Sequence, residues 1–325
     1  MTNTKSGIAI AGSILVDKIY EISAYPNPGQ LTQIKDIKLA VGGCVPNDAI
    51  DIKKMRPDIK VCAIGKIGND EEGEFILKNL SCNGVLTDKI TYSQIKTSFT
   101  DVMSVTGGQR TFFTYPGASA DFGYTDIDCN TLDVKMLHLG YFLLLDKIDN
   151  GDGIKILKSA TEMGIKTSID LVSENSSRYS LVIPCLKYTD NLIINETEAG
   201  MMVGIEPSNE NLYTIAKKLQ ELGVKERVII HKPDVGICLH GEEFTVVPSY
   251  QLPDGFIKGT TGAGDAFCAG ALIGIHDDKT DKEILKFASA AAVMALSEAD
   301  ATSGIISQEK IISFCNKLDR KKICL

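Results

Sequence analysis

The sequence has little of several features that mark specialised classes of protein. It contains no tryptophan and only 10 prolines, and neither a repeat period nor a low-complexity linker interrupts its 325 residues. Its nine cysteines include no C-x-x-C pair. An odd number of scattered cysteines is typical of reduced thiols in a cytoplasmic protein. We therefore expect a cytoplasmic protein in which Cys62, Cys238 and Cys268 are small core residues.

Long hydrophobic runs and an excess of basic residues are also missing. The apolar run near the N-terminus is broken by Gly12 and ended by Asp17, so it is too short and too polar for a signal peptide or a membrane span. Lys and Arg number 34 against 42 Asp and Glu, a net charge of -8, which disfavours a nucleic-acid surface. The composition, 44% hydrophobic and 23% charged, is that of a soluble globular protein. A length of 325 residues allows one large α/β domain with a small appendage.

Short apolar runs rich in branched residues recur along the chain, and several are separated by amphipathic stretches of helical length. This alternation predicts a mainly parallel sheet covered by helices on both faces. In such sheets, ligands bind beyond the carboxyl ends of the strands. The runs expected as strands are GIAIAGSIL, KVCAIGKIG, VKMLHLGYFLLL, GIKTSIDL, NLIIN and RVIIH, and the expected helices include residues 152–163, 209–222, 262–275, 281–297 and 308–318.

Two segments alternate polar and apolar residues and break this rhythm. Residues 97–116 alternate around Gly107 and Gly108, a pattern typical of a hairpin with a two-residue turn of the primed type. Residues 31–41 alternate in the same way. We expect these segments to form a small second sheet, a flap that would close over substrate and exclude water.

The stretch GTTGAGDAFCAG, residues 259–270, is the strongest candidate for an anion site. The FIK before it is strand-like and the residues after it are helical, which places Gly262, Ala263 and Gly264 at a helix N-terminus. Free N–H groups and the helix dipole attract anions there. The lysine of a P-loop and the third glycine of a dinucleotide fingerprint are both absent. From the residues alone, Asp265 is either a helix cap or a functional group.

Asn195 and Glu198 are three residues apart at the start of a predicted helix. One amide and one carboxylate on the same helix face suit Mg²⁺, which keeps much of its water shell. The same pair also fits a capping box, and the two roles do not exclude each other. The four histidines, at positions 138, 231, 240 and 276, show no metal-ligand spacing and are expected in the core or on the surface.

The stretch GTTGAGDAFCAGAL closely resembles the C-terminal motif of the ribokinase-like (PfkB) carbohydrate kinase family. Other segments resemble further motifs of that family, in its order: GSILVD, similar to the family's first strand and ending at Asp17, GGCVPNDA at 42–49, IGKIGNDEEGEFILKNLSCNGV, and NETE at 195–198. The resemblance extends from about Gly7 to the last helices. It implies an α/β fold, the ribokinase-like three-layer sandwich, in one kinase domain of residues 1–325, with a lid formed by discontinuous segments around 14–41 and 97–116.

The resemblance also implies an ATP-dependent kinase that phosphorylates a hydroxyl of a small sugar or sugar acid and uses Mg²⁺. Asp265 would be the catalytic base, and the N–H groups of Gly262, Ala263 and Gly264 would stabilise the transferring group. The residues implied for ATP or phosphate are Thr260, Thr261, Gly262, Gly264, Lys232 and Gly236, and those implied for Mg²⁺, through water, are Asn195 and Glu198. The residues implied for substrate are Asp17, Gly42, Gly43, Asn47, Arg110 and Asp170, with a solvated hairpin tip as the alternative for Arg110.

Three positions depart from the family pattern. Gly259 replaces an aspartate that in many members belongs to a monovalent-cation site, so activation by K⁺ is uncertain, although backbone carbonyls could still bind the ion. Cys44 and Leu15 replace a lysine and an asparagine of ribokinases. Both changes disfavour ribose and leave fructose as the leading expectation, with Cys44 as a small neutral residue lining the sugar site.

Two other functions stay open. An adenosine-type nucleoside kinase shares the fold, although no second purine pocket is evident in the sequence. A non-catalytic sugar- or nucleotide-binding regulator would keep the scaffold, but Asp265, Asn195 and Glu198 argue against it. Hairpins of this kind often pair between subunits in the family, so a homodimer through the lid is expected, and no nucleic-acid or membrane partner is.

Overall fold

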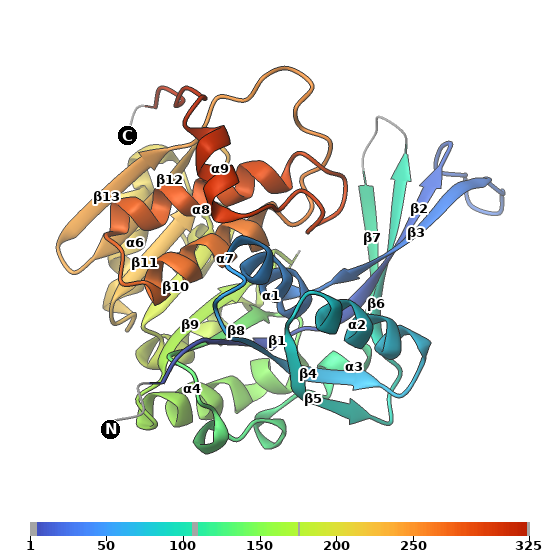
Figure 1. Cartoon of the computed structure of the whole chain (residues 1–325), viewed down its shortest axis with the longest axis horizontal. Coiled ribbons are helices and arrows are strands. Elements are labelled where there is room, and N and C mark those ends of the chain that lie inside the picture. Colours follow the sequence, from blue (N-terminus) through green and yellow to red (C-terminus); the bar gives the residue numbers. More distant parts are fainter. Residues whose placement is uncertain (1–4, 106–109, 175, 324–325) are drawn as a thin grey trace.

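A computed structural model describes residues 5–105, 110–174 and 176–323. Within these residues the strands form two separate sheets, one of nine strands and one of four (Figure 1). The nine-stranded sheet has the order β13-β12-β11-β10-β9-β8-β1-β4-β5, in which β12 is antiparallel to both of its neighbours and all other neighbouring pairs are parallel. Its strands are β1 (Ile8–Gly12), β4 (Val61–Gly68), β5 (Leu86–Ser93), β8 (Met136–Phe142), β9 (Lys166–Leu171), β10 (Asn191–Asn195), β11 (Arg227–His231), β12 (Val235–His240) and β13 (Glu243–Pro248).

Helices cover both faces of this sheet, because its central strands are apolar on both sides. In β1, Ile8 and Ile10 pack into one helical layer while Ala9 and Ala11 pack into the other. The first layer contains α1 (Cys44–Met55), α2 (Glu71–Cys82), α7 (Ala263–His276), α8 (Asp281–Ala295) and α9 (Gln308–Cys315), and the second contains α4 (Gly153–Glu162), α5 (Glu196–Val203) and α6 (Leu212–Glu221). The expected three-layer α/β sandwich is thus confirmed.

The small sheet is the predicted second sheet and projects from one end of the molecule (Figure 1). Its order is β3-β2-β6-β7, with β2 parallel to β6 and antiparallel to β3, and β6 antiparallel to β7. The expected hairpin turn at Gly107 and Gly108 lies outside the described residues. The strands are β2 (Leu15–Ile22), β3 (Ile34–Gly42), β6 (Ser98–Val105) and β7 (Arg110–Tyr115).

The chain passes from the large sheet to the small one within two residues. After Gly12 ends β1, the N–H of Ile14 donates to Ser119 Oγ at 3.1 Å, and that hydroxyl donates to the Ile14 carbonyl at 2.9 Å. The backbone N–H and carbonyl of Ile14 thus bond to a side chain and not to a neighbouring strand, which separates β1 from β2. Asp17 consequently lies inside β2 of the small sheet, and its expected place in the first strand is wrong.

The predicted strand FIK before the glycine turn is also wrong. Phe256 to Lys258 lie in a loop, where the Phe256 ring stacks on Phe314 with centroids 5.5 Å apart. The N–H of Lys258 donates to the Leu296 carbonyl at 2.9 Å and so does not join a ladder. The segment is apolar because it packs against the C-terminal part of the chain.

No helix in the described ranges is long and apolar enough to span a bilayer. The eight cysteines in those ranges are all free, and seven of them are buried.

Candidate active site

The glycine turn begins α7 and requires glycine at its first residue. Gly262 has a φ of 78°, and a Cβ there would lie 2.4 Å from Ala301 Cα, so both the backbone conformation and the space exclude a side chain. Gly264 and Asp265 follow in the first helical turn, where N–H groups lack intrahelical partners. The predicted helix N-terminus at the glycine turn is therefore present.

Asp265 is a buried carboxylate held by two other parts of the chain. Asn47 Nδ2 from α1 donates to its Oδ2 at 2.8 Å, and the Tyr141 hydroxyl from β8 donates to its Oδ1 at 2.9 Å. Burial, and after it the negative charge of Asp170, raises the pKa of Asp265 to about 6, against the lowering effect of the two hydrogen bonds. The carboxylate is thus placed by side-chain contacts and is more basic than an ordinary aspartate.

Asn47 is brought to Asp265 by the turn between β3 and α1. Gly43 has a φ of 84° there, and a Cβ on it would lie 2.6 Å from the Ser13 carbonyl oxygen. The preceding residue, Gly42, pairs with Leu15 at the end of the small sheet. Asp17 lies two residues further along β2, where burial, and after it the charge of Asp265, raises its pKa to about 7.

A cavity of about 520 Å³ joins these groups. It lies between the small sheet and the carboxyl ends of the central strands, and its size is ordinary for a small-molecule site. The polar residues that line it include Asp17, Asn47, Thr100, Thr114, Tyr141 and Asp265. Carboxylate, amide and hydroxyl groups facing one cavity can accept from and donate to a ligand rich in hydroxyl groups.

A second cavity, of about 170 Å³, extends from Asp265 along the N-terminus of α7 to the start of α5. Asn195 and Glu198 lie there and form the predicted capping box: the Glu198 N–H donates to Asn195 Oδ1 at 2.9 Å and the Asn195 N–H donates to Glu198 Oε2 at 3.1 Å. Burial raises the pKa of Glu198 to about 8. Burial also lowers the pKa of His231, which lines the same cavity, to about 4, so its ring is neutral.

Arg110 connects the lid to the loop before α7. Its guanidinium donates to Thr261 Oγ1 and, at 3.4 Å, to the Ala299 carbonyl. Arg110, Thr260 and Thr261 line a third cavity, of about 980 Å³, next to the glycine turn. The side chain is therefore directed at the loop before α7.

Three comparisons with known proteins decide the family. Residues 6–308 match the model of the pfkB family carbohydrate kinases. The chain belongs to this family. It is therefore a sugar kinase of the ribokinase/fructokinase family, an ATP-binding phosphotransferase.

Similar proteins carry different substrate names. A bifunctional ribokinase/ribose-5-phosphate isomerase A from Fructilactobacillus sanfranciscensis is 25% identical over 95% of this chain, which spans 56% of that relative. Fructokinase-1 from Oryza sativa subsp. japonica is 23% identical over 93% of this chain and 95% of its own length.

Solved structures show the same fold. Arabidopsis thaliana ribokinase complexed with ribose and ATP matches with a TM-score of 0.80 at 21% identity, over 95% of this chain and 98% of the other. A ribokinase-like protein from E. coli, in complex with ATP and Mg²⁺, matches with a TM-score of 0.78 at 19% identity, over 96% and 99% of the two chains.

Three further residues were expected to bind substrate or ATP in this sugar kinase: Asp170, Lys232 and Gly236. Only the first of them lines one of the cavities beside Asp265. Asp170, the penultimate residue of β9, accepts from the Tyr141 N–H at 2.5 Å and lines the cavity of about 170 Å³. The Lys232 amine donates to Asn209 Oδ1 at 2.6 Å. Gly236 lies in β12 and faces the side chains of Phe267 and Leu285. Within the described residues, Lys232 and Gly236 line none of the three cavities around the glycine turn.

The lining of the sugar-sized cavity differs from the sequence-based expectation at two residues. Cys44 is fully buried and its thiol packs against Gly12 and Gly140, so it lies behind the turn and does not line the sugar-sized cavity as expected. Tyr141 was not predicted at all, because it lies in an apolar run. Its φ of 59° is rare outside glycine and turns its hydroxyl to Asp265, and no sequence pattern marks such a conformation.

The loop at Gly259 does not provide a carboxylate for a monovalent cation. A Cβ on Gly259 would lie 3.0 Å from the Glu298 carbonyl oxygen and 3.1 Å from that of Ala299. The Ala299 oxygen already accepts from the positively charged Arg110. The residues present at this loop thus fit K⁺ less well than the family aspartate would.

Changing Asp17 to Asn should stabilise the protein in a pH-dependent way. The folded pKa of about 7 exceeds the ordinary value of 3.8, so the carboxyl group favours folding at low pH and loses this contribution as the pH rises towards 7. The gain in unfolding free energy from Asp17→Asn should be larger at pH 8 than at pH 5, by about 1–3 kcal/mol. Urea unfolding at both pH values measures it. The exposed Asp36→Asn on β3 is the control, and equal gains at both pH values would contradict the assignment.

Proposed function

We propose that the protein is an ATP-dependent kinase that phosphorylates a hydroxyl group of a small sugar or sugar acid, most readily fructose. The observation that carries this proposal is the position of Asp265. Its carboxylate faces the cavity of about 520 Å³ and also lies in the first turn of the helix that forms the anion hole. A sugar hydroxyl and a phosphoryl group would therefore meet at this residue.

In the proposed reaction, Asp265 is the catalytic base. The sugar hydroxyl oxygen forms a bond to the γ-phosphorus of ATP while the bond from that phosphorus to the bridging oxygen breaks, and ADP leaves. The hydroxyl proton passes to Asp265. A pKa of about 6 keeps this carboxylate mainly ionised at neutral pH. The bonds from Asn47 and Tyr141 use one lone pair on each oxygen, so a third donor can still bind.

The glycine turn would stabilise the charge on the transferring phosphoryl group. The N–H groups of Gly262, Ala263 and Gly264 are fixed by the start of α7 and need no reorganisation during the reaction. Thr260 and Thr261 precede the turn, and Arg110 bonds to Thr261 from the lid. This contact supports a lid that closes over substrate and excludes water.

Asn195 and Glu198 would hold Mg²⁺ through its water shell. The cavity beside them reaches Gly262, Gly264 and Asp265, so an ion with water ligands fits between them and the phosphates. The bound ion would neutralise phosphate charge. Because the pKa of Glu198 is about 8, ion binding would displace a proton from this residue.

Glu198→Gln should raise the Mg²⁺ concentration for half-maximal activity by about tenfold, because Gln cannot lose a proton to form the carboxylate that binds the hydrated ion. The melting temperature should stay the same, since Gln also fits a capping box. Activity titrated against MgCl₂ and a thermal melt measure the two effects. Glu196→Gln, at the first residue of α5 and outside the lining of this cavity, is the matched control. An equal shift in both variants would argue against the Mg²⁺ role.

The lining of the sugar-sized cavity supports fructose over ribose as the first choice. Leu15 faces the cavity where ribokinases carry a polar asparagine, so one hydrogen-bonding group is missing there. A site without that group cannot pair a hydroxyl at the same place, and the loss disfavours a substrate that needs it.

A panel of sugars and nucleosides, assayed with ATP and Mg²⁺ for ADP release, tests the proposal. We expect kcat/KM for fructose to exceed that for ribose by roughly tenfold or more, the usual worth of one unpaired polar group. Turnover of nucleosides alone would favour the nucleoside kinase. Tight binding of ATP or sugar without turnover of any compound would favour a regulator.

Asp265→Asn should lower turnover by roughly two to four orders of magnitude, the usual contribution of a positioned base. ATP affinity should not change, because the amides of the glycine turn stay in place. Steady-state assays and calorimetric titration with ATP measure the two properties. A variant with near-normal turnover would exclude Asp265 as the base.

The outer face of the lid supports a homodimer. Leu39, Lys18, Asp101 and Phe113 lie in one row across its four strands, and the two apolar side chains in this row are exposed by 55% and 58%. Leu39 and Phe113 lie on the two edge strands of the small sheet, with Lys18 and Asp101 between them. Exposed large apolar side chains on one face of a sheet support an association site there. Light scattering of the protein and of Phe113→Asp measures this association.

Free, mostly buried cysteines also support a reducing compartment, the cytoplasm, as the place of action.

A further inference from the structure

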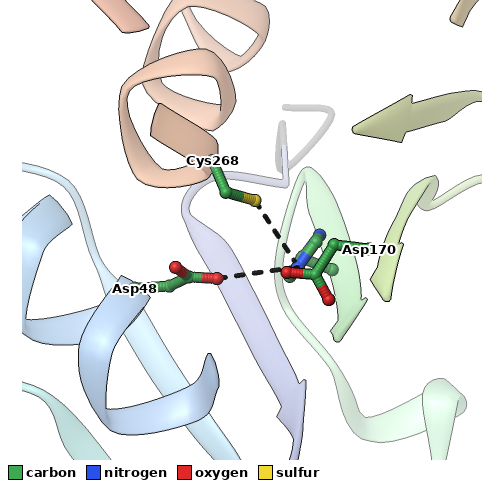
Figure 2. A group of neighbouring side chains, drawn as sticks. Asp48, Asp170 and Cys268 are labelled. Atoms are coloured by element: carbon green, nitrogen blue, oxygen red, sulfur yellow. Dashed lines mark hydrogen bonds and ion pairs between the residues drawn. The ribbon is translucent and has the colours of Figure 1, made fainter. Parts of the chain in front are cut away.

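Four buried side chains meet directly behind the candidate active site (Figure 2). They are Asp48 from α1, His138 from β8, Asp170 from β9 and Cys268 from α7. His138 Nε2 lies 3.6 Å from each of three atoms: Asp48 Oδ2, Asp170 Oδ2 and Cys268 Sγ. Figure 2 shows the Asp48, Asp170 and Cys268 side chains pointing toward a common centre.

Asp48 is the unexplained member of this group. It is 0% exposed, and among the described residues its carboxylate oxygens accept no hydrogen bond from an N–H or O–H group, the Cys268 thiol being their neighbouring donor. Burying a carboxylate without hydrogen bonds or a counter-charge is costly, and such groups are normally paired or bound to a metal. Asp265, three residues from Cys268 on the same helix, shows the contrast, because both of its oxygens accept hydrogen bonds.

The separations between the four atoms suit a small tetrahedral ion. Bonds of about 2.0–2.3 Å from nitrogen, oxygen and sulfur to one ion place neighbouring ligand atoms about 3.3–3.7 Å apart. The three distances from His138 Nε2 fall in this range, and all four atoms lie within 4.8 Å of one another. An ion at the centre needs only a small contraction of the group.

The imidazole of His138 is oriented as a ligand by a neighbouring strand. Its Nδ1 lies 2.9 Å from Ser168 Oγ on β9. A proton on Nδ1 donated to this hydroxyl leaves the lone pair of Nε2 directed at the other three groups. Metal-binding histidines commonly have such a partner on their second nitrogen.

We propose that Asp48, His138, Asp170 and Cys268 bind one divalent transition-metal ion of the zinc type. A thiolate and an imidazole favour such an ion over Mg²⁺, which prefers oxygen ligands throughout. Two carboxylates and a thiolate would leave the loaded site with a charge of about −1. Four protein ligands fill the tetrahedron, so the site is structural and carries no open position for catalysis.

The ion has a route to its site. Asp170 and Cys268 also line the cavity of about 170 Å³ that runs along the N-terminus of α7. Three of the four ligand-bearing elements, α1, β8 and α7, also carry the active-site residues Asn47, Tyr141 and Asp265, one to three positions from a ligand. A bound ion would tie these elements together and hold the three residues in register.

Metal content and spectroscopy of the full-length protein test the site without any substrate. Protein treated with EDTA and then loaded with Zn²⁺ should retain one Zn²⁺ per chain after gel filtration, measured by plasma mass spectrometry. Loading with Co²⁺ should produce a thiolate-to-cobalt charge-transfer band. Cys268→Ser and His138→Gln should each weaken metal affinity by at least roughly tenfold, and Cys268→Ser should remove the band.

Cys315→Ser is the matched control, because Cys315 is an equally buried free thiol on α9 outside the group. It should keep both the metal and the band. Where a ligand variant does not fold, judged by circular dichroism, the Co²⁺ titration of the unmodified protein decides alone. The proposal would be overturned if the unmodified protein gave no charge-transfer band with Co²⁺. It would also be overturned if folded Cys268→Ser and His138→Gln retained as much metal as the unmodified protein. Neither result depends on which sugar, if any, is phosphorylated.

Discussion

The active site depends on one buried carboxylate that other segments must satisfy. Asp265 begins the last part of the fold, whereas its hydrogen-bond donors, Asn47 and Tyr141, come from the first and middle parts. Burial of this charge is tolerable only because both oxygens accept hydrogen bonds. The same bonds bring the start of α1, the end of β8 and the start of α7 together, so the cavity around Asp265 forms only when all three have packed.

The small sheet provides the other wall of this cavity through strand alternation. Asp17, Thr100 and Thr114 occupy paired positions on β2, β6 and β7 and therefore share one face. Leu39 and Phe113 are each displaced by one residue from the row that contains Asp17, Thr100 and Thr114, so they lie on the opposite face. One sheet thus presents hydroxyl and carboxylate groups on its cavity face and exposed apolar side chains on its outer face. A shift of one residue in register would exchange the two faces.

Local patterns in the sequence predicted those parts of the protein that local physics determines. The parallel sheet, the small second sheet, the capping box at Asn195 and the helix start at Gly262 each follow from periodicity or from residues a few positions apart. The FIK segment was wrong because an apolar stretch can pack against a distant chain end as well as join a sheet. Tyr141 was missed because its role comes from a left-handed backbone conformation and a partner 124 residues away.

The group of Asp48, His138, Asp170 and Cys268 also could not be predicted from local sequence patterns. No spacing marked its histidine, because its ligand atoms come from four elements separated by most of the chain. Parallel β-topology places such residues side by side at adjacent strand ends without any local motif. Asp48 lies next to Asn47 on α1 and Cys268 lies one helical turn after Asp265 on α7. The two residues that hold the base and the base itself are therefore backed by the same four-element junction, and whatever neutralises Asp48 also sets how rigidly Asp265 is held.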